Sequence, residues 1–271
     1  MYSPILKKKP LISVIINCFD GEKFLTKCIK SVLSQSYQNW EIIFFNNNSS
    51  DQSVKILNSF RDRRIKLFNN NKKKNFKLYK ARNIAISKAK GKYITFLDTD
   101  DLWKKNKLKK QIELINKNPE VNIIYSNYYI IEEEKKKIYL KHKKKLPSGF
   151  ITQELLNDYK IGILTLLVSK KIFSHYKFKD KYSIIGDFDY MINLSRKFNI
   201  TAIQEPLAFY RIHQSNLSSK RLDLFAKELK NWINYNKFKL LKQGFNLKKI
   251  EFYLFKLKVK MFLKNNFNFK F

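Results

Sequence analysis

The sequence predicts an α/β protein with a doubly wound, mostly parallel sheet and a helical C-terminal extension. Short apolar runs of strand length alternate with stretches of helical periodicity over the first half of the chain. Such alternation is typical of βαβ units, in which crossover helices make neighbouring strands parallel. From residue 221 onward the sequence is rich in lysine and has apolar residues at helical spacing, which indicates two terminal helices.

Four strands and two connecting helices are expected in the first hundred residues. Apolar runs place the strands at residues 11–16, 41–45, 65–68 and 93–97. Apolar residues within 25–33 recur on one helical face, with Asp20 as the expected N-cap and Cys28 in the core. A second helix over residues 82–89 is expected to end with Gly91 in the C′ position.

The second half of the chain is less regular. A helix over residues 108–115 precedes a β-rich run at 123–131. Residues 132–145 are nearly all charged, which indicates an exposed hairpin or insertion. A turn, a short helix, an apolar strand and another helix are then expected at 147–149, 152–159, 163–168 and from about Asp187 onward.

Positive charge dominates the composition, because 56 lysine and arginine residues face 22 aspartate and glutamate residues, a formal net charge of +34. A charge of this size suggests a polyanion partner, so a basic nucleic-acid-binding protein is one alternative function. Only seven of the basic residues are arginines, however, whereas specific readers of phosphates and bases depend on the arginine fork. We therefore expect no specific nucleic-acid recognition and attribute most of the charge to a solvated surface.

Cysteine content and hydropathy indicate a cytoplasmic protein. Cys18 and Cys28 are the only cysteines, which excludes a disulfide framework and favours a reducing compartment. The apolar run near the N-terminus has six residues, too few for a signal-peptide core or a membrane span.

The C-terminal tail carries an aromatic seam at helical spacing, formed by Phe252, Phe255, Val259 and Phe262. One interpretation places this seam on an anionic membrane, with the neighbouring lysines towards the headgroups. The other interpretation packs the helix on the rest of the chain. The sequence leaves both open, so peripheral contact with the inner face of the cell membrane is a hypothesis at this stage.

Polar segments follow three of the four N-terminal strands, and an arginine opens the helix after the remaining one. The segments are residues 17–21, 46–51 and 98–101, and the helix begins with Arg82 and Asn83. In an open α/β sheet, ligands bind beyond the carboxyl ends of the strands. We therefore expect these segments to face one crevice.

Three carboxylates lie within four residues, at Asp98, Asp100 and Asp101. They repel one another unless a cation or hydrogen-bond donors hold them. An Asp-x-Asp pair suits Mg²⁺ or Mn²⁺, which takes one or two carboxylates and completes its shell with water and phosphate oxygens. The alternative is that Asp100 or Asp101 caps the next helix and the other acids are solvated.

Five segments resemble, in order and spacing, the motifs of family 2 glycosyltransferases with the GT-A fold. They are residues 13–19, 41–43 with the polar segment that follows, 81–83, 91–101 and 186–189. Together these motifs are specific for the family, although none is specific alone. The resemblance extends over about residues 10–215 and does not include the tail.

This resemblance implies a domain layout and an activity. A glycosyltransferase domain would span residues 1–220, with a nucleotide-sugar part at about 10–130, an acceptor part at about 131–220, and the lysine- and aromatic-rich helical tail at 221–271. The implied enzyme moves one sugar, with inversion, from a nucleoside-diphosphate sugar to a hydroxyl of a cell-surface glycan or a lipid-linked acceptor. UDP-sugars are the first candidates for the donor. The Gln-x-x-Arg-Trp segment of processive synthases is absent from the sequence, which favours transfer of a single sugar.

The resemblance also implies the residues of the site. Those that bind the nucleotide sugar would be Cys18, Phe19, Asp20, Asn46, Arg82, Asp98, Thr99 and Arg211. A divalent metal, Mn²⁺ or Mg²⁺, would be held at the diphosphate by Asp98, Asp100 and His213. Asp187 would be the catalytic base that removes the proton from the acceptor hydroxyl.

Two positions depart from the family pattern. Asn46 stands where many members have an aspartate that accepts a hydrogen bond from uracil, so the identity of the base is open. Gly186 replaces the glutamate that commonly precedes the position of Asp187. These departures leave a second alternative function open, a module that binds a sugar nucleotide or glycan without catalysis.

Overall fold

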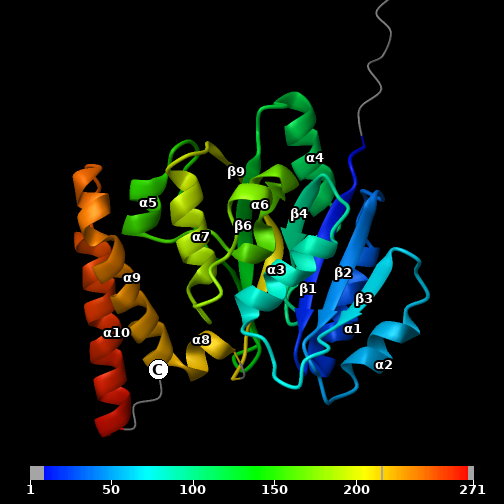
Figure 1. Ribbon diagram of the computed structural model, residues 1–271, viewed down its shortest axis with the longest axis horizontal. Coiled ribbons are helices and arrows are strands. Elements are labelled where there is room, and N and C mark those ends of the chain that lie inside the picture. The colour runs from blue at the N-terminus through cyan, green and yellow to red at the C-terminus, as the bar shows by residue number, and fades with distance from the viewer. Residues whose placement is uncertain (1–8, 215, 268–271) are drawn as a thin grey trace, which may run out of the picture.

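A computed structural model describes residues 9–214 and 216–267, in which one sheet is covered by helices on both faces (Figure 1). The N-terminal half contains the strands β1 (Ile12–Cys18), β2 (Trp40–Asn46), β3 (Ile65–Asn69) and β4 (Tyr93–Phe96). They are connected by the helices α1 (Glu22–Leu33), α2 (Ser53–Ser59) and α3 (Leu78–Lys88). The four strands and two helices predicted here are confirmed with shifted ends, and α2 is an additional short helix.

The rest of the chain contributes three short strands and two long ones. The strands are β5 (Leu102–Trp103), β6 (Ile123–Glu132), β7 (Lys137–Leu140), β8 (Leu167–Ser169) and β9 (Ile200–Ile212). The helices are α4 (Lys107–Lys117), α5 (Thr152–Asn157), α6 (Lys170–His175) and α7 (Gly186–Ser195). The charged segment predicted as a hairpin is confirmed as the β6–β7 turn, whereas the strand predicted at 163–168 begins as a 3₁₀ turn and becomes β8.

The strand order is β3-β2-β1-β4-β8-β6-β9-β5, with β7 paired to β6 outside this path. The first four strands are parallel neighbours, and β9 is parallel to β6. Because β8 is antiparallel to both β4 and β6, the strands β1 to β4, β6 and β9 all run in one direction. The predicted doubly wound, mostly parallel sheet is therefore confirmed, with a mixed second half.

Successive side chains of the strands point to opposite faces of the sheet and pack into two separate cores, one on each face. On one face, Ile12, Val14 and Ile16 of β1 pack with apolar residues of α1, α2 and α4. On the other face, Ile15 joins a larger cluster that includes α3, α6 and α7. The parallel register aligns the strand ends, since Cys18 lies opposite Asn46, so the polar segments after β1 and β2 meet at one edge.

Two local predictions are wrong. Asp20 does not cap α1, because the cap position is Gly21, and the first-turn N–H of Glu22 instead donates to Asp51 Oδ2 at 2.8 Å. Gly91 is not a left-handed C′ residue, because α3 ends at Lys88 and Gly91 has no positive φ. Gly91 is required for a different reason: a Cβ there would lie 2.5 Å from the backbone nitrogen of Ser13 in β1.

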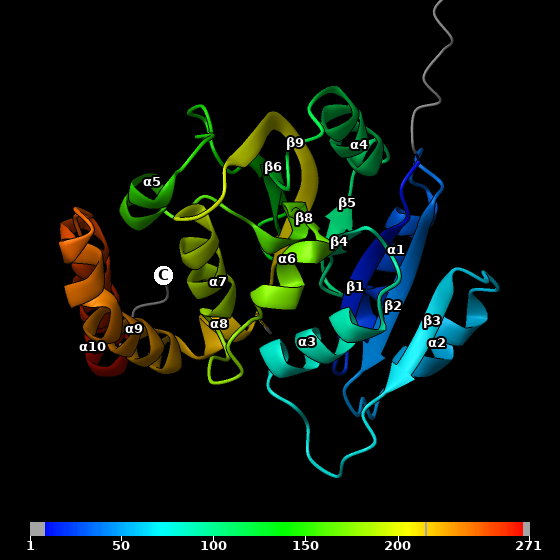
Figure 2. The same cartoon turned by 45° about the horizontal axis from the view of Figure 1, so that its top comes forward.

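The C-terminal tail forms the two predicted helices, α9 (Leu222–Lys242) and α10 (Lys248–Phe267), and a short helix, α8 (Leu217–Lys220), precedes it. Both views place α9 and α10 together at one end of the molecule, with β3 and α2 at the other end (Figures 1 and 2). Buried side chains of α9 and α10, including Trp232 and Leu254, belong to the same core cluster as α3 and α7. Within the described residues, no helix combines the length and apolar character that crossing a bilayer demands.

Candidate active site

A cavity of about 1050 Å³ opens beyond the carboxyl ends of the parallel strands. Its wall combines the segments after β1 and β4 with α3, the start of α7 and residues of α9 and α10. Seven residues that the sequence predicted for the site line this cavity: Cys18, Phe19, Arg82, Asp98, Thr99, Asp100 and Asp187. Segments that are distant in sequence therefore meet in one place, including Asp187 with the acidic segment after β4.

Arg82 is the buried cation of the site. Its Nη2 lies 2.6 Å from Asp98 Oδ1, and its side chain is 2% exposed. The rings of Tyr79, Phe96 and Phe178 surround the guanidinium at 5.4 to 5.9 Å. Burial opposes its charge, but the negative charges of Asp98 and Asp187 outweigh burial and raise the pKa of Arg82. A permanent positive charge therefore lies within the influence of both acids.

Asp187 is a carboxyl group with raised proton affinity. Burial raises its pKa, while the charge of Arg82 and a hydrogen bond from Tyr79 lower it without cancelling the effect of burial. The Tyr79 hydroxyl lies 3.0 Å from Asp187 Oδ1 and 2.8 Å from the carbonyl oxygen of Ile184. A carboxylate that is desolvated in this way is a stronger base than a solvated one, which is the property that proton abstraction requires.

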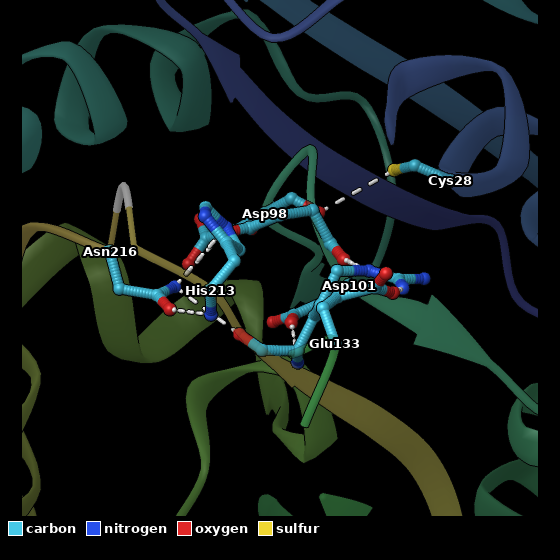
Figure 3. A network of polar contacts seen from close by, with 8 residues as sticks. Cys28, Asp98, Asp101, Glu133, His213 and Asn216 are labelled. Carbon is cyan, nitrogen blue, oxygen red and sulfur yellow. Dashed lines mark hydrogen bonds and ion pairs between the residues drawn. The ribbon is translucent and has the colours of Figure 1, made fainter. Parts of the chain in front are cut away.

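The end of β9 fixes the acidic segment after β4 (Figure 3). His213 Nε2 lies 2.9 Å from Asp100 Oδ2, and Asn216 Nδ2 lies 3.3 Å from the same oxygen. The backbone N–H of Arg211 donates to Asp101 Oδ1 at 2.9 Å, and its Nε donates to the carbonyl oxygen of Asp100 at 2.8 Å. The end of β9 thus holds the loop after β4 in place, although the two strands are more than a hundred residues apart in the sequence.

The repulsion within the acidic segment is only partly relieved by its partners. Burial and the charge of Asp98 raise the pKa of Asp100, although His213 opposes the shift. Burial and the charges of Asp100 and Asp98 raise the pKa of Asp101 well above its usual range. A cation at this loop would reverse these shifts, because it would favour the ionised form of each carboxyl.

The residues at the end of β4 fit a divalent cation whose shell a ligand completes. Within the described residues, no cluster of three or more histidine, cysteine, aspartate or glutamate side chains could hold a metal alone. Asp98 and Asp100 do both line the cavity, and Mg²⁺ or Mn²⁺ needs only one or two carboxylates when phosphate oxygens and water supply the rest. The predicted ligand His213 is bonded to Asp100 and does not itself line the cavity.

Four predicted residues do not line the cavity: Asp20, Asn46, Arg211 and His213. Asp20 joins the first two loops, since its Oδ1 accepts the N–H of Ser50 at 2.8 Å. Asn46 uses both ends of its amide within the protein, accepting the N–H of Ser49 at 2.9 Å and donating to Asn69 at 3.0 Å. Arg211 is buried and pairs with Glu133.

Asn17 is a site residue that the sequence analysis did not assign. It lines the cavity, and both polar atoms of its amide are buried without a hydrogen-bond partner among the residues that the structure describes. Buried polar groups are nearly always paired, so this amide points to a ligand that supplies the partner. Its position at the end of β1, within the first motif, was the available signal.

Glu228 supports the site from outside the cavity and carries no local signal in the sequence. Its carboxylate accepts the backbone N–H groups of Ser183, Ile184 and Ile185 at 2.7, 3.0 and 3.2 Å. These residues immediately precede α7, which carries Asp187 in its first turn. A side chain of the tail helix α9 therefore positions the segment that leads into Asp187.

A parallel N-terminal sheet, a mixed second half and paired acids after β4 define the GT-A class of glycosyltransferases. Among solved structures, S. aureus TarS 1–349 in complex with UDP is similar, with a TM-score of 0.60 and 17% identity over 81% of this chain and 65% of that chain. The mannosyltransferase PcManGT from Pyrobaculum calidifontis in complex with GDP-Man and Mn²⁺ also has a TM-score of 0.60, at 11% identity, over 84% of this chain and 65% of its own. The chain thus spans slightly less than two thirds of either solved chain, and these similarities concern the fold.

The family model "Glycosyl transferase family 2" matches residues 13–189, and the chain belongs to this family. A relative from Escherichia coli, "UDP-Glc:alpha-D-GlcNAc-diphosphoundecaprenol beta-1,3-glucosyltransferase WfgD", is 33% identical over 81% of this chain and 83% of its own length. The "putative teichuronic acid biosynthesis glycosyltransferase TuaG" of Bacillus subtilis is 27% identical over 86% and 90%, respectively. The predicted membership of family 2 and the GT-A fold are confirmed.

Proposed function

We propose that this glycosyltransferase transfers one sugar, with inversion, from a UDP-sugar to a hydroxyl of a lipid-linked saccharide used for a cell-surface glycan. The observation that carries the proposal is the meeting of Asp187, Arg82 and Asp98 at one cavity. Similarity to WfgD over most of both chains supports a UDP-sugar donor and an acceptor that carries a lipid diphosphate. UDP-glucose is therefore the first donor to test.

The segments after β1 and β2 would hold the nucleoside, and Arg82 would balance the diphosphate. Phe19 is exposed at the cavity and offers a ring face, while the unpaired amide of Asn17 offers both a donor and an acceptor. Asp98 and Asp100 would hold a divalent cation, which when bound neutralises charge on the departing diphosphate. Arg211 and His213 would act by fixing the loop that contains these acids.

Asp187 would act as the general base. Its carboxylate takes the proton of the acceptor hydroxyl while that oxygen attacks the anomeric carbon from the face opposite the leaving nucleotide. A single displacement of this kind inverts the configuration at that carbon. Proton transfer by a positioned group contributes about 10² to 10⁴ in rate.

A transfer assay with UDP-sugars and a GlcNAc-diphosphate-lipid acceptor tests the proposal, in Mn²⁺, in Mg²⁺ and in a chelator. We expect a β-linked product and loss of turnover in the chelator. Asp187→Asn should lower kcat by 10² or more while UDP still binds, because the amide cannot take a proton. Asp180→Asn, an exposed acid outside the cavity, serves as the matched control. Normal turnover in Asp187→Asn would refute the role of Asp187.

The non-catalytic alternative rests on Gly186 and Asn46, and the same assay addresses it. Calorimetry of UDP binding with and without Mn²⁺ measures the site independently of turnover. Metal-dependent nucleotide binding without transfer to any acceptor of the panel would favour a binding module. Transfer by the unaltered chain would eliminate that alternative.

A further inference from the structure

The terminal helix α10 has one buried apolar face and one exposed apolar face. Ile250, Leu254 and Leu257 are buried in the core cluster shared with α9 and α5. The predicted aromatic seam lies on the outer side: Phe252, Phe255, Val259 and Phe262 are 56, 60, 40 and 62% exposed. The helix therefore packs on the rest of the chain, as one interpretation of the sequence predicted, and still presents its seam to the outside.

Positive charge lies directly beside this seam. Lys249 and Lys256 are exposed, and the Lys256 ammonium lies 4.6 Å from the centroid of the Phe252 ring. The rings of Phe252 and Phe255 stack at 6.3 Å. Aromatic rings that insert beneath headgroups, flanked by lysines that meet anionic phosphates, are the pattern of a helix that lies in a membrane interface.

The same helix also borders the cavity. Ile250 and Tyr253 line it, together with Phe225 and Leu229 of α9 and Phe188 of α7. These side chains make that end of the cavity apolar, whereas the end at Arg82 and Asp98 is polar and charged. The helix α10 thus connects the outer seam with the apolar end of the cavity.

We propose that the seam of α10 rests on an anionic lipid bilayer and that the apolar end of the cavity receives the lipid-linked acceptor from it. The route of the acceptor rests on the proposed function, whereas the contact between the seam and the bilayer does not. Charge complementarity selects the lipid surface over a second copy of the chain, because two copies with a net charge of +34 each would repel at this face.

Flotation of the full chain with vesicles tests the contact, using phosphatidylcholine alone or with about one third phosphatidylglycerol. Because the whole chain is basic, any of its faces can attract anionic lipid, so matched variants decide the question. Phe252→Ser/Phe255→Ser removes two exposed rings of the seam. Ile138→Ser/Tyr139→Ser removes two exposed side chains from the β6–β7 hairpin and is its control.

We expect binding to the anionic vesicles and about tenfold weaker partitioning for the Phe252→Ser/Phe255→Ser variant, with the control unchanged. Lys249→Gln/Lys256→Gln should also weaken binding more than Lys30→Gln/Lys55→Gln, which removes two exposed lysines from α1 and α2. Circular dichroism and UDP binding verify that each variant is folded.

Equal binding by the seam variant and its hairpin control would overturn the proposal, as would failure of the unaltered chain to bind anionic vesicles. A change from dimer to monomer in the seam variant, without loss of vesicle binding, would assign the face to a second copy instead. Vesicle binding is measured without donor or acceptor, so it can fail while transfer to a detergent-solubilised acceptor succeeds. The acceptor route is tested separately: the seam variant should lose activity on an acceptor in vesicles and keep it on the same acceptor in detergent.

Discussion

Tyr79 explains why the chain has a glycine where the family commonly has a glutamate. A Cβ added at Gly186 would lie 2.4 to 2.6 Å from the ring carbons of Tyr79, so a side chain at this position has no room. The Tyr79 hydroxyl in turn reaches Asp187, the next residue in the chain. The ring of Tyr79 from α3 thus occupies the space beside Gly186, and its hydroxyl gives the carboxyl of Asp187 a hydrogen-bond partner.

Gly186→Ala should be destabilising because of this contact. Tyr79 is 2% exposed and packs against Phe178, so we expect a loss of about 1 to 3 kcal/mol in the free energy of unfolding, measured by urea titration. In a Tyr79→Ala background, Gly186→Ala should lower the free energy of unfolding much less, because the clashing ring is absent. Additive effects of the two substitutions would contradict this explanation.

Tyr79→Phe should shift the pH dependence of turnover. The hydrogen bond from Tyr79 lowers the pKa of Asp187, against burial, which raises it. Loss of the hydroxyl therefore raises this pKa further. Since the base acts as a carboxylate, kcat rises with pH through its pKa, and the rising limb should move to higher pH.

Profiles of kcat against pH for the unaltered chain, the Tyr79→Phe variant and a control variant measure this shift. Tyr125→Phe is the control, because the Tyr125 hydroxyl donates to the carbonyl oxygen of Pro147, and Tyr125 does not line the cavity. An unchanged rising limb in Tyr79→Phe would show that the hydroxyl does not tune the base.

At the scale of elements, the carboxylate of Glu228 links α9 to the segment that leads into α7. Glu228 is buried in α9, and its carboxylate accepts the N–H groups of residues 183–185, which lead into α7. A second link crosses the same interface, since Trp232 Nε1 donates to Asp189 Oδ1 at 2.9 Å. The start of α7, and Asp187 with it, is therefore held from the tail.

Glu228→Gln should impair turnover without changing donor affinity. The amide can accept with only one of its two terminal atoms, so at least one backbone N–H loses its partner, at a cost of about 1 to 3 kcal/mol in stability. We expect kcat to fall, while the Kd of UDP, measured by calorimetry, stays within about twofold of the value for the unaltered chain. Glu251→Gln in α10 is the control, because that acid pairs only with Lys237 among the contacts described. A parallel loss of UDP affinity would indicate general unfolding instead.

The strands β1, β2 and β4 were predictable because they are buried on both faces and appear as nearly continuous apolar runs, whereas the edge strand β3 is half-buried. The long strand β9 has no such run: most of its residues are half-buried, Gln204, Glu205 and Pro206 interrupt it, and the pairing with β6 shifts register there. Similarly, β5 has two residues and obtains its place from pairing with β9. Pairing of this kind is tertiary and leaves no periodicity in the chain.

The candidate site was predictable where its residues follow strands directly. Asp98 and Asp100 obey this rule, whereas Arg82 lies inside α3, which begins at Leu78 and not at Arg82 as predicted; the family resemblance added Asp187. Tyr79 and Glu228 were missed because their partners are distant in sequence, at Asp187 and at residues 183–185. Such contacts depend on how helices pack on the sheet, which local spacing does not encode.

For the whole molecule, the sequence predicted a tail separate from a domain over residues 1–220, a division that remains a prediction. The shared core gives a different expectation for folding. Trp232, Leu240 and Leu254 of the tail belong to the same buried cluster as Ile15 of β1 and Ala85 of α3. Packing of this extent favours one cooperative unit.

A single-tryptophan variant tests this cooperativity. In Trp40→Phe/Trp103→Phe, Trp232 alone reports on the tail, whereas circular dichroism reports on the whole chain. We expect the two signals to give the same midpoint of thermal unfolding. An earlier transition at Trp232 would support an independent tail.

The anchoring of residues 183–185 by Glu228 has a consequence for exchanging parts between relatives. A chimera that receives its last fifty or so residues from another family member must also receive an acid at this place, or the loop before Asp187 loses its anchor. Tails from different relatives therefore cannot be joined freely to this chain at the end of β9 in order to exchange preferences for donor, acceptor or membrane. Natural diversification of such tails should show paired changes in the two segments.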